Sequence, residues 1–181
     1  TRLARLICRA ISPGFLPRHK RSSTGGWISN CRTDGCLERD DATARVSFQH
    51  ADVEFQDDRI SDEIYVGYDM DRRYGPFQPT FGVSITADGS SWVGAGVKWT
   101  SARVIDSPFF IETSLMPGLY SQSDGPDLGG SLHFRSAFGA GYRFDNGATL
   151  SVLYDHRSNG DTHNLNPGLE TIAVRYAIAL N

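Results

Sequence analysis

From about residue 45 to the C-terminus, apolar and polar side chains alternate, and turn-forming residues interrupt the alternation every 10 to 15 positions. Alternation with a period of two is typical of β-strands that have one apolar face. The pattern predicts eight strands, at residues 45–56, 61–72, 77–87, 91–101, 108–120, 131–144, 147–158 and 169–180. The first strand is the least regular, because its alternation changes phase midway. Asp145–Gly147, with the sequence Asp-Asn-Gly, is a strong signal for a tight hairpin. We therefore expect an all-β fold, an eight-stranded antiparallel barrel with up-and-down meander topology.

The two faces of the predicted strands differ in kind. One face carries a row of bulky apolar side chains on nearly every strand, with Tyr, Trp and Phe recurring near strand ends, as in the aromatic girdles of membrane barrels. The opposite face combines small residues with charges, namely Asp69, Lys98, Glu112, Arg135, Arg143 and Arg175. Small residues and paired charges would fill the narrow lumen of an eight-stranded barrel. The pattern favours a transmembrane β-barrel over a soluble lipocalin-like barrel, which would need an apolar lumen.

Composition and charge narrow the classes of protein further. Hydrophobic residues make up 39% of the chain, in runs of only a handful, whereas a spanning helix needs roughly 18 to 20 consecutive apolar residues. A helical membrane protein is therefore excluded. Residues 42–181 carry ten basic and seventeen acidic side chains, a net charge of 10 − 17 = −7. This acidic balance gives no support for nucleic-acid binding.

The first 44 residues differ from the rest of the chain. Residues 1–33 hold seven Lys or Arg and no acid, and the segment lacks clear periodicity and a convincing secretory signal. We interpret residues 1–44 as an N-terminal extension that is disordered or absent from the mature protein, and residues 45–181 as the barrel. All three cysteines, Cys8, Cys31 and Cys36, lie in the extension and have no matching ligand set for a metal. We therefore expect no metal site.

Three polar residues interrupt the apolar rows where the last two predicted strands meet their loop. His156 and Ser158 continue the apolar row of one strand, and Glu170 begins that of the next. Residues two apart on a strand point the same way, so the three side chains would lie together on the lipid-facing side. A serine becomes a nucleophile when a neighbouring base takes its proton, and a carboxylate orients that base. The trio is therefore a candidate ester-hydrolysing site, although a merely polar hairpin tip would contain the same residue types.

Ester hydrolysis also needs donors that stabilise an oxyanion. Asn159, Gly160 and Asn166 in the intervening loop are the candidates. Asp161 and His163 in the same loop are interpreted as solvated loop residues, and His133 as a lumen residue.

The stretch "HRSNGDTHNLNPGLE" resembles the signature of the outer-membrane lipid A 3-O-deacylases, the PagL-type family. The match falls on His156, Ser158, Asn159, Asn166 and Glu170. The resemblance implies an eight-stranded barrel in the bacterial outer membrane whose active site faces the outer leaflet. It also implies an esterase that removes the 3-O-linked acyl chain from lipid A of lipopolysaccharide, without a cofactor.

By the same resemblance, Ser158 would be the nucleophile, His156 the general base and Glu170 the orienting acid. Asn166, with the backbone at Asn159, would stabilise the oxyanion. A homodimer is left open. The rival hypotheses are a non-enzymatic outer-membrane barrel with a structural or adhesive function, and a soluble lipocalin-like binding barrel.

Overall fold

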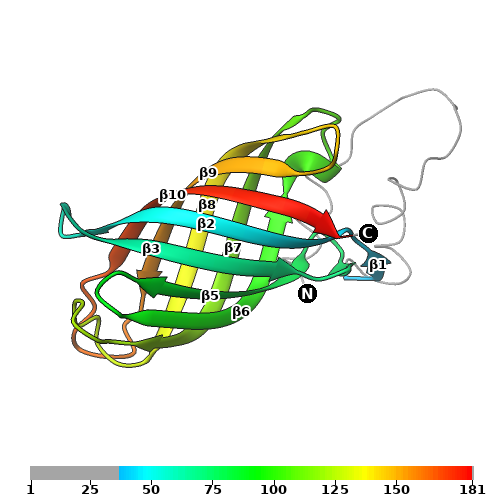
Figure 1. The fold of residues 1–181 in the computed structure, drawn as a ribbon. Helices are drawn as coiled ribbons and strands as arrows, with labels where there is room; N and C mark the ends of the chain where they lie inside the picture. The colour runs from blue at the N-terminus through cyan, green and yellow to red at the C-terminus, as the bar shows by residue number, and fades with distance from the viewer. Residues whose placement is uncertain (1–36, 181) are drawn as a thin grey trace, which may run out of the picture.

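Eight antiparallel strands close into a barrel in the computed structural model, which describes residues 37–180 (Figure 1). The barrel strands are β2 (Ala44–Phe55), β3 (Asp58–Asp69), β5 (Gln78–Thr86), β6 (Ser91–Thr100), β7 (Phe109–Ser121), β8 (Leu132–Arg143), β9 (Thr149–Ser158) and β10 (Leu169–Leu180). Each strand pairs with its sequence neighbour in the barrel, and β10 pairs with β2 to close it. The predicted eight-stranded antiparallel fold is confirmed. No helix within residues 37–180 is long and apolar enough to cross a membrane.

Two short strands lie outside the barrel wall. β1 (Arg39–Asp41) pairs with β4 (Arg72–Tyr74) in a separate two-stranded sheet, and η2 (Ser101–Arg103) is a single 3₁₀ turn. β1 falls within the last residues of the predicted extension. Residues 1–36, which include the three cysteines, lie outside the described part of the chain.

The predicted strand at residues 61–72 was placed three residues too late. β3 begins at Asp58 because the turn before it consists only of Gln56 and Asp57, with φ of 52° and 69°. Positive φ at both central residues is the geometry of a two-residue type I′ hairpin. The polar start of β3 resembles a loop in sequence, although it pairs with β2 from Asp58 onward, with one irregularity in register opposite Val53 and Glu54.

The outer surface of the barrel is largely apolar, and its inner surface is mostly polar apart from a cluster around Tyr65, Trp92 and Met116. In β10 the large side chains of Ile172, Val174 and Tyr176 are exposed, while Thr171, Ala173 and Arg175 are buried. The other barrel strands repeat this alternation, although β2 and the start of β3 also carry polar side chains on the outer face. It is the reverse of a lipocalin-like barrel with an apolar lumen and agrees with an outer wall that faces lipid.

β2 corrects one detail of the sequence interpretation. Its alternation does not change phase: Ser47, Gln49 and Ala51 are buried in the lumen, and His50 and Asp52 point outward. The apparent irregularity arises because polar residues occupy outward positions that are apolar on the other strands.

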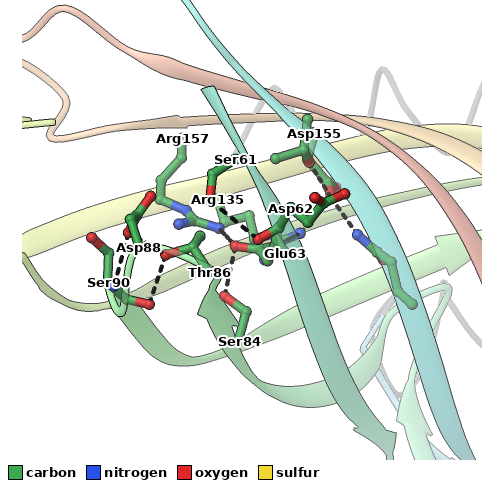
Figure 2. Close-up of polar contacts among 12 residues, drawn as sticks. Ser61, Asp62, Glu63, Ser84, Thr86, Asp88, Ser90, Arg135, Asp155 and Arg157 are labelled. Atoms are coloured by element: carbon green, nitrogen blue, oxygen red, sulfur yellow. Dashed lines mark hydrogen bonds and ion pairs between the residues drawn. The ribbon is translucent and has the colours of Figure 1, made fainter. Parts of the chain in front are cut away.

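Ion pairs fill much of the lumen. Glu63 on β3 is fully buried and accepts hydrogen bonds from Arg157 Nη2 at 2.6 Å and Ser84 Oγ at 2.8 Å, while Arg135 Nη2 lies 2.9 Å from its other oxygen (Figure 2). Arg135 also donates to Asp155 at 2.5 Å. These contacts join β3, β8 and β9 across the barrel. The predicted lumen residues Asp69, Lys98, Glu112, Arg135 and Arg175 are all buried, and Arg143 is half-buried.

The two ends of the barrel carry different features (Figure 1). The end that we call the loop end carries the β2–β3 and β5–β6 turns and the loops at 122–131 and 159–168. The opposite end, the terminus end, carries β1, β4, η2, the β8–β9 turn and the end of β10. The candidate catalytic residues therefore belong to the loop end.

Candidate active site

His156 and Glu170 face each other across β9 and β10. The two residues are direct partners in the strand register. His156 Nδ1 lies 2.9 Å from Glu170 Oε1, and their side chains are 41% and 29% exposed on the outer wall. Adjacent strands place such partners within hydrogen-bond reach, so the fold alone brings together two of the three predicted catalytic residues.

Ser158 lies on the same outer face, two positions beyond His156. The strand rise separates the two residues by about 7 Å along β9, and no hydrogen bond joins their side chains in the described structure. Catalytic hydrogen bonds are often long without substrate and tighten when it binds. Phe134 on β8 is the register partner of Ser158, so an aromatic side chain flanks the hydroxyl.

The loop at 159–168 holds the three predicted oxyanion residues in different ways. The side chain of Asn159 is fully buried and donates to the carbonyl oxygens of Leu128, Gly129 and Leu165 at 3.1, 2.8 and 2.6 Å. The backbone N–H of Asn159 donates to Asn166 Oδ1 at 3.0 Å. Asn159 thus connects the two long loops and stabilises them.

Gly160 differs from Asn159 and Asn166, the other two predicted oxyanion donors. It is exposed, has a φ of 62°, and its backbone N–H makes no hydrogen bond within residues 37–180. The Asn166 amide, by contrast, donates to Asp161 Oδ1 at 2.8 Å. Of the three predicted donors, Gly160 is the one whose N–H needs no rearrangement of the loop to bind an anion.

Asp161 and His163 are exposed, as expected of loop residues, but both make specific contacts. Asp161 holds Asn166, as described above, and adopts a positive φ of 60°. The His163 ring packs against Gly130 so closely that a Cβ atom there would lie 2.3 Å from Nε2. Both side chains therefore help to fix the loop that leads to Glu170. His133, predicted to lie in the lumen, is fully buried beside Tyr120.

Gly168 has a steric role that the sequence does not reveal. Its φ is 78°, and an added Cβ would lie 3.1 Å from His156 Cε1 and 3.5 Å from Glu170 Oε1. Left-handed backbone and a lack of space both favour glycine here. The Asn-Pro-Gly sequence marks a turn but gives no sign of this contact with the His–Glu pair.

Arg157 and Asp155 anchor the strand beneath the site. They alternate with His156 and Ser158, and their side chains enter the lumen, where they are 3% and 2% exposed. The ion pairs of Figure 2 therefore hold β9 from within while its outer face presents the candidate catalytic residues.

A polar patch on β2 and β3 adjoins the His–Glu pair on the outer wall. Glu54 is the β2 partner of Glu170, and Arg59 bonds to Asp52 and Asp62 at 2.7 Å each. His50 lies 3.4 Å from Asp62. In the sequence, the irregular alternation of β2 was the sole sign of this polar patch. Within residues 37–180, no three His, Cys, Asp or Glu side chains are placed to hold a metal ion.

An eight-stranded antiparallel barrel with an apolar outer wall and a filled polar lumen has the architecture of an outer-membrane protein. The family model for lipid A 3-O-deacylase (PagL) matches residues 59–179. The chain therefore belongs to the PagL family, an outer-membrane family of lipid A deacylases, as the sequence motif indicated.

Solved structures agree on the fold. The crystal structure of the outer membrane enzyme PagL has a TM-score of 0.62 at 21% identity, covering 75% of this chain and 99% of that one. Neisserial surface protein A (NspA) has a TM-score of 0.55 at 8% identity, covering 79% and 99% of the two chains. A de novo designed transmembrane β-barrel has a TM-score of 0.51 at 16% identity, covering 80% and 99%. No curated protein matches the sequence, and the comparisons give no support for the homodimer left open above.

Proposed function

We propose that this chain removes the 3-O-linked acyl chain from lipid A through a Ser158–His156–Glu170 triad on the lipid-facing wall. The observation that carries the proposal is the hydrogen bond between His156 and Glu170 on the outer face, beside Ser158. A carboxylate on Nδ1 leaves Nε2 of the imidazole as the base, because the carboxylate fixes the tautomer. Family membership supplies the substrate class.

In the proposed mechanism, Ser158 Oγ attacks the carbonyl carbon of the ester while His156 Nε2 accepts the hydroxyl proton. The ester C–O bond then breaks, and His156 returns the proton to the departing sugar oxygen. Water, activated by the same histidine, hydrolyses the acyl-enzyme and releases the fatty acid. Glu170 stabilises the imidazolium at both stages.

For the oxyanion we propose Gly160 as the first donor, since its N–H makes no hydrogen bond in the loop. Asn166 and the Asn159 N–H are already bonded to each other. The Asn159 N–H would join Gly160 only if its bond to Asn166 opened, and the Asn166 amide only if its bond to Asp161 opened. Removal of one oxyanion donor typically costs about 10²- to 10³-fold in kcat.

The loop lengths support a proposal for the orientation of the barrel. Outer-membrane barrels have short periplasmic turns and longer extracellular loops, and the two longest connections, 122–131 and 159–168, both lie at the loop end. We therefore place the triad toward the outer leaflet. There the outward-facing hydroxyl of Ser158 would meet an ester that never leaves the membrane.

The test is the mass spectrum of lipid A from cells that produce the protein. Wild type should remove one ester-linked 3-hydroxyacyl chain, and Ser158→Ala and His156→Asn should abolish the change while still forming a heat-modifiable barrel. Ser121→Ala, an exposed serine at the loop end of β7, is the matched control and should retain activity. Deacylation by Ser158→Ala would contradict the mechanism, and an unmodified lipid A profile with wild type would favour a non-enzymatic barrel.

A further inference from the structure

The terminus end of the lumen contains a second polar site, far from the candidate triad. A cavity of about 510 Å³ opens there. Its charged lining residues are Arg45, Arg73, Lys98, Arg103, Arg143, Asp41 and Glu112. Five cations against two carboxylates leave the lining with a formal charge of 5 − 2 = +3.

Two of the five cations have carboxylate partners. Lys98 pairs with Asp69 and lies 3.7 Å from Glu112. Arg73 pairs with Asp40 on β1. The remaining lining carboxylate, Asp41, is exposed on β1. The acids around the cavity are therefore either already paired or turned to solvent.

The other three cations are guanidinium groups that bond only to uncharged oxygens. Arg45 Nη1 donates to the Gly147 carbonyl at 2.7 Å, and Arg143 Nη2 donates to the Ser107 carbonyl at 3.3 Å. Arg103 Nη2 donates to the side-chain oxygen of Gln78. No ion pair joins any of these three to a carboxylate in the described part of the chain.

Arg103 is the least satisfied of these three guanidinium groups. Its Nη1 atom is buried and has no hydrogen-bond partner within residues 37–180. Burial is the main cause that lowers the pKa of Arg103 to about 10, and the positive charge of Arg73 lowers it further. A buried donor without a partner costs free energy, more so when it is charged, and a bound anion would offset that cost.

We propose that this cavity is an oxyanion-binding site of the phosphate class, formed by Arg45, Arg103 and Arg143. Guanidinium groups match the geometry of phosphate oxygens and donate two hydrogen bonds at once. The residues come from β2, η2 and β8, so the closed barrel is what brings them together. The site lies at the opposite end of the barrel from Ser158, and its test is independent of lipid A deacylation.

Phosphate chemistry has two sources here, free phosphate in solution and the head group of a phospholipid at the barrel rim. The test uses the refolded full chain in uncharged detergent micelles and phosphate-free buffer. Inorganic phosphate is titrated calorimetrically in one arm, and phosphatidylglycerol vesicles are mixed with the protein in the other. Saturable binding in the first arm identifies free phosphate as sufficient, and saturable binding only in the second identifies a lipid head group. Either supports the site.

Variants then locate the binding. Arg103→Gln and Arg143→Gln should each weaken binding about tenfold, because each removes a charged hydrogen-bond donor. Arg72→Gln is the matched control: Arg72 is on β4 at the same end, pairs with Asp71 and does not line the cavity. Heat modifiability confirms that each variant is folded.

A readout on wild type alone keeps the proposal testable if a variant misfolds. The phosphorus NMR line of inorganic phosphate should broaden with the protein and sharpen again when sulfate competes. Absence of saturable binding in both arms overturns the proposal. So does an equal loss of binding in Arg72→Gln and Arg103→Gln.

Discussion

Arg157 lies between His156 and Ser158 on β9, and its side chain points away from them into the lumen. There it donates to Glu63 Oε2 at 2.6 Å, with both side chains at most 3% exposed. Replacing Arg157 by Met keeps the length of the side chain and removes its charge. We expect this change to weaken both the barrel and the placement of the two candidate catalytic residues on the outer face.

The size of the effect follows from the contacts of Glu63. Removing one partner of a buried ion pair typically costs about 3–5 kcal/mol. In the variant, Glu63 keeps its contacts with Arg135 at 2.9 Å and Ser84 at 2.8 Å. The loss of unfolding free energy in Arg157→Met should therefore be near the lower end of this range, about 3 kcal/mol. Arg157→Lys retains a charge that can reach Glu63 and should recover part of the loss.

Arg175→Met is the matched control. Arg175 is also a buried lumen arginine, but it donates its hydrogen bond to the neutral Gln49 at 2.9 Å. Loss of a hydrogen bond of this kind costs about 1 kcal/mol, so this variant should remain closer to wild type.

Urea unfolding in lipid vesicles measures the stability of each variant, and deacylation of purified lipid A by the folded fraction measures activity. A displacement of about 1 Å at a catalytic group can cost roughly 10²-fold. Arg157→Met should therefore lower kcat far more than it raises KM, because substrate contacts on the outer wall stay in place. An unfolding midpoint equal to wild type, or an equal loss of kcat in Arg175→Met, would refute the reasoning.

Three further predictions follow from single contacts. Gly168→Ala should lower deacylation and cost about 1–2 kcal/mol of unfolding free energy, because alanine is strained at positive φ and its Cβ would crowd His156; wild-type kinetics in this variant would contradict the contact. Glu170→Gln should lower kcat by roughly 10²- to 10⁴-fold with an unchanged urea midpoint, and rates that match wild type would exclude an orienting role. Burial acts to raise the pKa of Asp88, but hydrogen bonds from Thr86 and Ser90 outweigh it and lower the pKa (Figure 2). Asp88→Asn should therefore lower the unfolding free energy most at pH values above the usual aspartate pKa, and this loss should vanish as pH falls through the lowered pKa. A loss of unfolding free energy that is independent of pH in urea titrations would disprove this.

The sequence predicted the fold well because most strands alternate cleanly between an apolar and a polar face. The prediction was weakest at β2 and β3, where His50, Asp52 and Asp58 break the apolar pattern while the backbone continues to pair. Backbone pairing does not depend on side-chain polarity. A prediction based on hydrophobicity therefore misses parts of a strand where polar residues face outward.

The candidate site was predictable to the extent that it is local. His156 and Glu170 flank one hairpin loop, and strand register brings them together. The pairing of Arg157 with Glu63 spans 94 positions and depends on closure of the barrel, which no local pattern encodes. Asn159 shows the same limit: its position suggested an oxyanion donor but did not reveal that its side chain bonds to a loop 30 residues away.

The most direct test of the central claim is the lipid A mass spectrum of cells that produce either wild type or Ser158→Ala at equal levels of folded barrel. The account predicts loss of one ester-linked 3-hydroxyacyl chain with wild type and an intact lipid A with Ser158→Ala. The same loss with both proteins would contradict it.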